Sequence, residues 1–539
     1  MSDPATAGRG DVVAQAGDLV AGLAAQPWGQ VSPSIYETGR LVTLAPWLTG
    51  HTERLEYLVG AQRADGGWGS HDHYSLVPTL SATEALLGEL RRGVPHGGRE
   101  RIAAAADRGL DALFGWSRRG FDTPLPDMPA IELIVPYLTG GINRHLHHLT
   151  RSPLRLLSAW EGTAPLPVPR HMDDQKPAVI AARLRSGAAL PEKLHHALEV
   201  AGEAAAGARG VPLTPAGTIG ASPAATAAWL GTAGKTRPHH PARRHLEAVA
   251  GLHGGPVPCG VPITAFERGW VLSWLVRAGV PLRVPDALVA GLGDGLGPEG
   301  TPAGPGLPPD ADTTSVALYA LALLGAPREP GSLWRYRADP HFQTWHGEQG
   351  FSTTVNAHVL DCFGQYVTCR PGVRPRYATA MGEVESWLLA QQRADGSWSD
   401  RWHVSPYYAT MCCVLALDAW GGRESEHAVR RAVRWILAGR RAGGGWGLWR
   451  ATAEETAYAM QTLLLSRAAR EEPARDEAAA GGHAFLLQTA AAGDDPPMWV
   501  DKELYIPLAI VRAAILGALN LAQRDPGVTL RIRQSAKRT

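Results

Sequence analysis

Residues 392–399 read Gln-Arg-Ala-Asp-Gly-Ser-Trp-Ser, and residues 62–69 carry nearly the same stretch, Gln-Arg-Ala-Asp-Gly-Gly-Trp-Gly. Two looser copies are Arg-Ala-Gly-Gly-Gly-Trp-Gly at 441–447 and Gly-Glu-Gln-Gly-Phe-Ser at 347–352. The aromatic residues of the C-terminal series recur about every fifty residues, at Phe351, Trp398, Trp446 and Trp499. A repeat of this length fits one pair of helices with its loop, and a single pair cannot bury its apolar face alone. The sequence therefore predicts copies that stack on one another.

Each copy is expected to act as a structural turn rather than as a site of chemistry. The Asp-Gly step allows a tight reversal because glycine accepts a positive φ, and the tryptophan fills the space between neighbouring helices. Apolar stretches that suit helices follow the copies, for example at 409–419 and 455–465. The 62 glycines and 42 prolines cluster between Ala- and Leu-rich segments. We therefore predict an all-α protein of stacked helix pairs.

Composition and charge exclude several classes of protein. Lys and Arg total 52 against 51 for Asp and Glu, so the net charge of +1 does not indicate a nucleic-acid-binding protein. The five cysteines show no C-x-x-C spacing, which argues against a disulfide framework and favours a reducing compartment. Neither a signal peptide nor a bilayer-spanning apolar run is expected. We predict a cytoplasmic monomer or homodimer with at most peripheral membrane contact.

Two carboxyl groups precede an apolar stretch at residues 308–316, which read Pro-Pro-Asp-Ala-Asp-Thr-Thr-Ser-Val. One interpretation of Asp310 and Asp312 is helix capping, since Asp and Thr side chains accept hydrogen bonds from free backbone N–H groups. The other is general acid catalysis. Burying two adjacent carboxyls makes double ionisation costly, so one can stay protonated near neutral pH, although a helix N-terminus favours the charged form.

The motif Asp310-Ala-Asp312-Thr313-Thr314 resembles the D-x-D-D or D-x-D-T-T acid motif of the class II terpene cyclases. The tryptophan copies resemble the QW repeats of the same superfamily, which includes the squalene–hopene cyclases. Further segments are similar to those of bacterial diterpene and sesquiterpene cyclases, in the family's order: 32–38, 266–270, 352–360, 402–408, 454–458 and 502–507. The chain has Thr313 where a full D-x-D-D motif has a third Asp, as some members of the family do.

The resemblance implies roles at the acid site. The middle Asp of the motif is the family's proton donor, which makes Asp312 the acid and leaves Asp310 to adjust it through hydrogen bonding and charge. Asn356, in the segment Val-Asn-Ala-His, is implied to hydrogen-bond the acid and to hold its proton toward the substrate. His358, two residues further on, is expected to be structural.

A pocket for this chemistry must exclude water and present aromatic faces, because alkene protonation creates a carbocation. The candidate wall residues are Trp402, Tyr407, Tyr408, Trp345, Phe351, Trp449 and Tyr505. The diphosphate is retained and needs basic anchors, for which we expect Arg401 and Lys502. Mg²⁺ is expected to help bind the diphosphate, with Glu132 as a candidate ligand.

The resemblance also implies two (α/α) barrel domains, called β and γ in this family. The β domain is expected at 1–29 and 263–539, the γ domain is inserted at 30–262, and the active site lies between them. The expected reaction is the protonation-initiated cyclisation of geranylgeranyl diphosphate to a bicyclic labdane-type diphosphate. The alternative substrate is farnesyl diphosphate, which would give drimenyl diphosphate.

Two other functions stay open on the sequence. A squalene–hopene-type triterpene cyclase shares the acid motif but is usually longer, and a zinc-dependent or non-catalytic α-α barrel would need a partner chain. Ionisation of the diphosphate by a D-D-x-x-D cluster is not indicated, because Gln-Lys-Pro follows Asp173-Asp174. The histidine clusters at 145–148 and 237–241 lack a regular ligand spacing and are interpreted as surface or turn residues.

Overall fold

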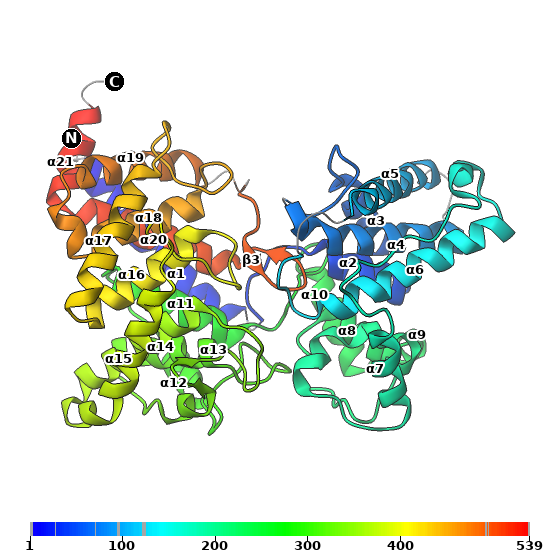
Figure 1. Ribbon diagram of the computed structural model, residues 1–539, viewed down its shortest axis with the longest axis horizontal. Coiled ribbons are helices and arrows are strands. Elements are labelled where there is room, and N and C mark those ends of the chain that lie inside the picture. Colours follow the sequence, from blue (N-terminus) through cyan, green and yellow to red (C-terminus); the bar gives the residue numbers. More distant parts are fainter. Residues whose placement is uncertain are drawn as a thin grey trace.

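The computed structural model describes residues 4–26, 28–70, 72–93, 98–120, 125–490, 493 and 495–536. These residues are largely helical, which confirms the all-α prediction, and they form two lobes (Figure 1). Two short antiparallel sheets are also present, β1 (Arg337–Ala338) with β2 (His341–Phe342) and β3 (Trp499–Val500) with β4 (Leu504–Tyr505). None of the described helices combines the length and the hydropathy needed to cross a membrane.

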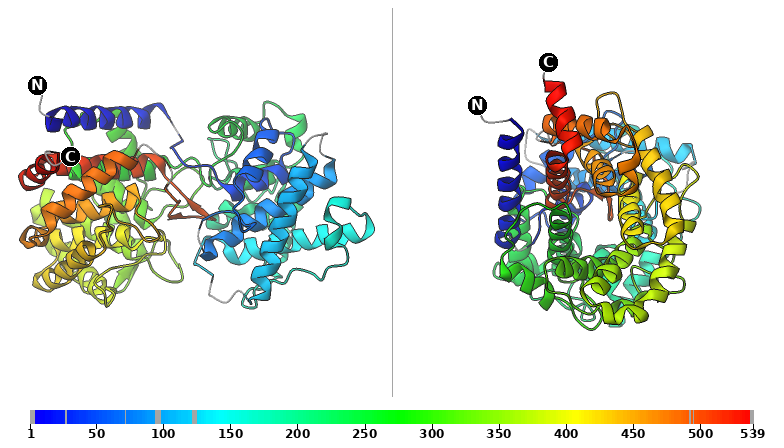
Figure 2. Two further views of the ribbon diagram at one scale, coloured as in Figure 1. Left: turned by 90° about the horizontal axis from the view of Figure 1, so that it is seen from above. Right: turned by 90° about the vertical axis from the view of Figure 1, so that its left-hand side faces the viewer.

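The larger lobe is a closed ring of helices. Six of the described helices each pack against the next, and the last returns to the first (Figure 2, right). They are α11 (Thr264–Arg277), α13 (Ala311–Leu323), α14 (Thr353–Cys369), α16 (Pro406–Trp420), α18 (Ala453–Leu465) and α20 (Leu508–Arg524). The helices packed around them are α1 (Pro4–Ala25), α12 (Asp286–Asp294), α15 (Arg374–Ala390), α17 (Arg423–Ala438), α19 (Arg475–Thr489) and α21 (Pro526–Ala536).

Inner and outer helices differ in where their apolar residues fall. The inner helix α16 is buried on all sides from Tyr407 to Leu417, as expected for a helix that is surrounded by protein. The outer helix α17 buries Ala428, Val429, Ala432 and Val433 on one face, while arginines and glutamates occupy the rest of its surface. An outer helix therefore covers an inner one with a single apolar stripe, which is the helix-pair arrangement that the repeat predicts.

The smaller lobe is built from the segment between α1 and α11. Its α-helices are α2 (Ile35–Leu44), α3 (His51–Gly60), α4 (Leu76–Arg92), α5 (Arg99–Arg118), α6 (Ile131–Arg151), α7 (Lys176–Arg185), α8 (Pro223–Leu230), α9 (Ala233–Thr236) and α10 (Pro241–Gly251). Its 3-10 helices are η1 (Asp72–Ser75), η2 (Arg155–Trp160) and η3 (Glu192–Ala205), while η4 (Gly331–Tyr336), η5 (Pro371–Val373) and η6 (Ala468–Glu471) belong to the larger lobe.

Each lobe has hydrophobic cores of its own. The large core of the ring draws on residues 12–23 and 270–528, so α1 packs onto the larger lobe although it precedes the smaller one. The cores of the smaller lobe draw mainly on residues 31–263, with Val500 and Leu504 of the β3–β4 hairpin added from the larger lobe. The domain boundaries at 29/30 and 262/263 stay a prediction, and these cores lie on either side of them.

Three of the repeated tryptophans, Trp68, Trp398 and Trp446, make the same two hydrogen bonds. The indole N–H donates to a backbone carbonyl in the preceding helix, and the backbone N–H donates to a threonine hydroxyl in the following helix. The indole bonds are Trp68 to Leu58 (2.6 Å), Trp398 to Leu388 (2.8 Å) and Trp446 to Ile436 (2.6 Å). The threonine partners are Thr79, Thr410 and Thr456, at 2.8, 3.0 and 3.0 Å. Each of these three copies thus joins two helices through its turn, as expected.

The glycine of the turn offers a test of this structural role. Gly444 has φ of +88°, and an added Cβ would lie 2.7 Å from the carbonyl oxygen of Gly481. Gly444→Ala is therefore expected to destabilise the fold by about 1–3 kcal/mol. In thermal denaturation this corresponds to a fall in apparent Tm of roughly 2–4 °C per kcal/mol for a lobe of this size.

Gly443 provides the matched control in the same turn, because no atom lies within 4 Å of an added Cβ there. Gly443→Ala is expected to leave the Tm within about 1–2 °C, as surface substitutions usually do. Equal Tm values for the two variants would contradict the structural role of the turn.

Candidate active site at the N-termini of the inner helices

The two carboxyl groups of the acid motif lie at the start of α13 but in different surroundings. Asp310 is the N-cap: its Oδ1 accepts a hydrogen bond from the backbone N–H of Thr313 at 2.6 Å, and its side chain is buried. Burial raises the pKa of Asp310 to about 7, the Thr313 N–H acts against this rise, and the charge of Asp312 adds to it. The capping interpretation is therefore confirmed for Asp310.

Asp312 is the carboxyl that reaches accessible space. Its side chain is 15% exposed, whereas every other residue from Ala311 to Ala322 is buried. Oδ1 of Asp312 lies 2.6 Å from Nδ1 of His358 on the neighbouring helix α14. The Asp312 carboxyl is thus held by an imidazole, while part of its side chain stays exposed.

His358 is charged by its contact with Asp312. Burial disfavours the charged ring, but the Asp312 carboxylate outweighs this effect and raises the pKa of His358 to about 10. The imidazolium Nδ1–H therefore donates to the carboxylate oxygen. The prediction that His358 is merely structural is wrong, because it is the hydrogen-bond partner of the acid.

Asn356 does not hydrogen-bond the acid, contrary to the prediction. Its amide nitrogen donates to the carbonyl oxygens of Phe342 (3.0 Å) and Ser352 (2.8 Å). Its oxygen accepts the Phe342 N–H at 2.8 Å. Both amide hydrogens are therefore used to fasten strand β2 to the start of α14.

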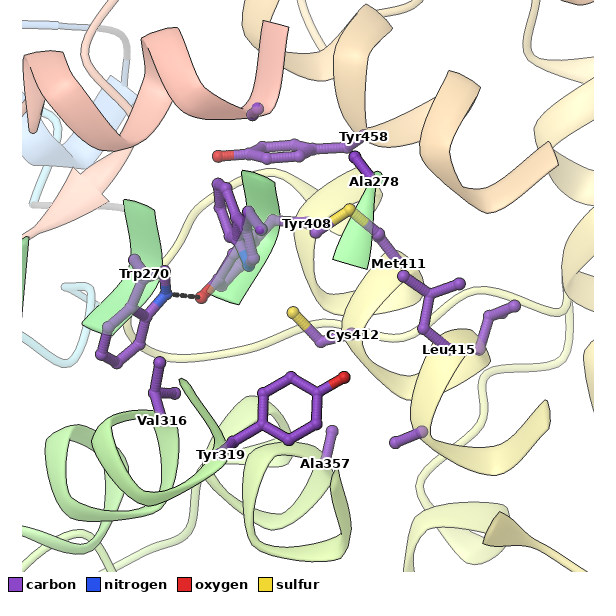
Figure 3. Close-up of a cluster of buried hydrophobic side chains, with 14 of the residues drawn as sticks. Trp270, Ala278, Val316, Tyr319, Ala357, Tyr408, Met411, Cys412, Leu415 and Tyr458 are labelled. Carbon is purple, nitrogen blue, oxygen red and sulfur yellow. Dashed lines mark hydrogen bonds between the residues drawn. The ribbon is translucent and has the colours of Figure 1, made fainter. Parts of the chain in front are cut away.

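Aromatic rings surround the Asp312–His358 pair. The Trp270 ring meets His358 edge-on, with centroids 5.3 Å apart, and its indole N–H donates to the Tyr408 hydroxyl at 3.0 Å. Figure 3 shows this hydrogen bond, with Tyr458 and Cys412 close to Tyr408. Phe266 packs on Trp270 with centroids 4.4 Å apart. Phe266 and Trp270 were missed as wall residues, although they lie in the family-like segment 266–270.

Four of the predicted wall residues lie near this group. Tyr408 is at its centre, and Tyr505 on β4 is paired with Trp499, whose ring lies 4.9 Å from that of Tyr408. Trp345 and Trp402 meet edge-on with centroids 5.3 Å apart. They flank Thr344, whose carbonyl accepts the Ala311 N–H at 2.9 Å beside the acid motif.

The other three predicted wall residues lie elsewhere. Tyr407 faces outward and packs on Trp435 of α17, with centroids 4.7 Å apart. Phe351 is 47% exposed and meets Trp387 edge-on. Trp449 packs against the core of the smaller lobe. These contacts place Tyr407 and Phe351 away from Asp312, so the prediction that they are wall residues is wrong. The role of Trp449 stays a prediction.

Arg401 lies between the lobes, where a diphosphate anchor is expected. Its guanidinium contacts Glu348 of the larger lobe and Asp127 of the smaller lobe, each at 2.5 Å. The guanidinium also lies over the Trp402 ring, 5.0 Å from the ring centroid. Nε of Arg401 is buried and has no hydrogen-bond partner. An anionic group could therefore replace these exchangeable carboxylate contacts, and the anchoring role of Arg401 stays a prediction.

Lys502 cannot anchor a diphosphate in this structure. Its ammonium group is fully buried and contacts Glu37 (2.5 Å), Glu199 (2.9 Å) and the Ser222 hydroxyl (2.9 Å), so all three hydrogens are used. These partners belong to the smaller lobe, whereas Lys502 lies in the β3–β4 turn of the larger one. The residue predicted to bind substrate instead ties the two lobes together.

No group of three or more His, Cys, Asp or Glu side chains within the described residues is arranged to hold a metal ion. Glu132 is exposed in the first turn of α6. Its role as a Mg²⁺ ligand stays a prediction. The interpretation of the first histidine cluster as surface residues is wrong for His145, which is buried with Nε2 3.2 Å from Oε1 of Glu84.

Comparison with known proteins identifies relatives along nearly the whole chain. Residues 350–493 match the family model described as "Squalene-hopene cyclase C-terminal domain". The "Ent-copalyl diphosphate synthase" of Streptomyces sp. (strain KO-3988) is 41% identical, over 95% of this chain and 96% of that protein. The "Labda-7,13-dienyl diphosphate synthase" of Streptomyces clavuligerus is 40% identical, over 95% of this chain and 94% of that protein.

A solved structure extends this similarity to the fold. The ent-copalyl diphosphate synthase from Streptomyces platensis superposes with a TM-score of 0.88 at 44% sequence identity, and the match covers 95% of this chain and 99% of that one. The likeness includes both lobes, because it spans nearly all of both chains.

Proposed function

The chain belongs to the class II terpene cyclases, and from this premise we propose that it converts geranylgeranyl diphosphate to a bicyclic labdane-type diphosphate. Its relatives named as copalyl and labdadienyl diphosphate synthases support this substrate over farnesyl diphosphate, squalene or a zinc-dependent reaction. The observation that carries the proposal is the partly exposed Asp312 carboxyl, held by His358 at 2.6 Å among aromatic rings.

The reaction begins with the transfer of one proton from Asp312. The Nδ1–H of His358 donates to Oδ1 of the Asp312 carboxylate, so we assign to Oδ2 the proton that Asp312 takes up before each turnover. The O–H bond breaks as a C–H bond forms at the terminal alkene, and a tertiary carbocation results. The imidazolium of His358 then stabilises the carboxylate that remains on Asp312.

Ring closure follows without any further acid. Two internal alkenes of the substrate attack in turn, two C–C bonds form, and the positive charge moves along the chain. The rings of Trp270 and Tyr408 offer π faces near the acid, and these stabilise a cation without trapping it as water would. Loss of one proton ends the sequence and leaves the diphosphate attached.

The diphosphate end needs positive charge at the boundary between the lobes. We assign this role to Arg401, which would exchange Asp127 for a phosphate oxygen. Mg²⁺ would neutralise the diphosphate, which supplies most of its ligands, and Glu132 would provide one carboxylate oxygen. We further propose a cytoplasmic location, since the five cysteines are all free.

The substrate assignment is tested by incubating the purified protein with Mg²⁺ and, separately, geranylgeranyl diphosphate, farnesyl diphosphate and squalene. The products are dephosphorylated and analysed by GC–MS. A bicyclic C20 alcohol from geranylgeranyl diphosphate alone is the expected result. A bicyclic product from farnesyl diphosphate or squalene only would contradict the proposal.

The pKa of about 7 for Asp310 predicts a pH dependence of the rate. Below this pH the Asp310 carboxyl is neutral. As the pH rises through about 7, Asp310 acquires a negative charge. This charge lies beside Asp312 and makes it harder for Asp312 to become negative by giving its proton to the alkene. The kcat is therefore expected to fall toward high pH in the wild type.

Asp310→Asn tests this origin of the high-pH decline, because Asn is also a good N-cap and keeps the start of α13. The pH profile of the variant, measured from pH 5.5 to 9, is expected to lose the decline near pH 7. An unchanged profile would show that another group is responsible.

A further inference from the structure

A second buried carboxyl, Glu454 at the start of α18, lies behind the aromatic rings. Its Oε1 accepts three hydrogen bonds, from Nε2 of His403 (3.1 Å), the Tyr458 hydroxyl (2.8 Å) and Nε1 of Trp499 (2.8 Å). Glu454 is almost completely buried, and its Oε2 has no hydrogen-bond partner. Three donors on one oxygen is the pattern of a carboxylate rather than of a neutral acid.

The donor role of His403 follows from its other nitrogen. Nδ1 of His403 accepts the backbone N–H of Ser405 at 3.1 Å, so the ring proton lies on Nε2 and points to Glu454. The ring is therefore neutral and holds one orientation. No cation contacts Glu454 among the interactions that the structure describes for it, so its negative charge is not cancelled by an ion pair.

All three rings bound by Glu454 pack on Tyr408. Centroid distances from Tyr408 are 4.6 Å to His403, 4.9 Å to Trp499 and 5.3 Å to Tyr458. Tyr408 in turn receives the Trp270 hydrogen bond, and its ring lies 6.5 Å from that of His358. A continuous set of contacts thus leads from Glu454 to the partner of the acid.

We propose that Glu454 is a positioning residue for the cyclisation, which fixes the rings around Tyr408 and supplies the negative charge that stabilises the migrating carbocation. The carboxylate accepts hydrogen bonds from the N–H and O–H groups of the three rings and thereby polarises them. Polarisation raises the electron density of the ring faces, which then attract a cation more strongly. The carboxylate lies behind the rings, so it does not capture the cation by forming a C–O bond. This inference rests on the proposed function.

The test compares Glu454→Gln with Glu455→Gln. Gln keeps an acceptor oxygen at position 454 but removes the charge. Glu455 is the matched control, since it is equally buried but serves the helix cap by accepting from Ser405 (2.5 Å), Leu448 N–H (2.8 Å) and Thr452 (2.9 Å). The probes are two geranylgeranyl diphosphate analogues, one with an ammonium nitrogen near the reacting alkene and one a neutral isostere.

Calorimetric titration of these analogues measures cation stabilisation without turnover. Glu454→Gln is expected to weaken binding of the ammonium analogue by about tenfold and of the neutral isostere by less than about twofold. The kcat on geranylgeranyl diphosphate should fall by at least about tenfold with little change in KM. Glu455→Gln should leave the ratio of the two affinities unchanged.

Equal effects of Glu454→Gln on both analogues, or no effect on either, would overturn the inference. If that variant fails to fold, Tyr458→Phe keeps the ring but removes one hydrogen bond to Glu454, and a selective loss for the ammonium analogue is again expected. Wild-type protein that binds the analogues selectively but does not convert geranylgeranyl diphosphate would contradict the proposed function alone. Wild-type protein that binds neither analogue would contradict both.

Discussion

Asp312→Asn is expected to lower kcat on geranylgeranyl diphosphate by about 10³- to 10⁴-fold, or roughly 4–5 kcal/mol in activation free energy. Asn has nearly the shape of Asp and can still accept the hydrogen bond from His358, but it carries no acidic proton. KM should change little, because the carboxyl adds nothing to the binding of an alkene. The measurement is steady-state conversion followed by GC–MS of the dephosphorylated product.

The matched control is Asp286→Asn, which alters an exposed Asp in the first turn of another helix of the same lobe, α12. It should retain wild-type activity. A fully active Asp312→Asn variant would mean that another group, such as Asp310, delivers the proton.

His358→Gln is expected to lower kcat by about 10²-fold, at the lower end of the effect of a group that assists proton transfer. Gln can still donate a hydrogen bond to Asp312, but it lacks the positive charge that stabilises the carboxylate after the proton has left. The loss should appear in kcat with little change in KM. Asn356→Ala provides the comparison, because it removes hydrogen bonds to the Phe342 backbone. It should lower the Tm, while the kcat of the folded protein changes little.

The same variant tests the charge of His358 through pH. The pKa of His358 is raised to about 10, so the Asp312–His358 pair contributes stability that is fully present below about pH 6.5 and is lost as the pH rises through about 10. The difference in Tm between wild type and His358→Gln should therefore narrow between pH 7 and 10. A difference that stays constant over this range would contradict an imidazolium at this position.

The helical repeat could be predicted from the sequence because it depends on local spacing. A tryptophan two residues after an Asp-Gly step can reach the helix before it and the helix after it, and Trp68 and Trp398 do so in the same way. The position of the acid could be predicted for the same reason, since Asp310 and Asp312 lie in one short motif.

The partner of the acid could not be predicted, because it depends on the rotation of α14. Residues advance by about 100° per position in an α-helix, so Asn356 and His358 point to nearly opposite sides. Only one of them can face α13, and it is His358. The neighbours Tyr407 and Tyr408 show the same effect on α16, where Tyr408 faces the ring interior and Tyr407 faces α17.

Lys502 was misassigned for a different reason. A lysine in a family-like segment suggests an anion site, but its partners come from residues far away in the chain. Glu37 and Glu199 converge on Lys502 only once the smaller lobe has folded against the β3–β4 turn. Because Lys502, Glu37 and Glu199 come from three distant segments, the residue spacing within any one segment does not predict their contact.

The measurement that tests the central claim most directly is turnover of geranylgeranyl diphosphate in D₂O, with mass and phosphorus analysis of the intact product. Because Asp312 exchanges its proton with solvent, each bicyclic product molecule should carry one deuterium on a carbon and should keep both phosphorus atoms. Release of inorganic diphosphate together with an undeuterated hydrocarbon would contradict the account, because it would mean that the reaction starts by ionisation of the diphosphate.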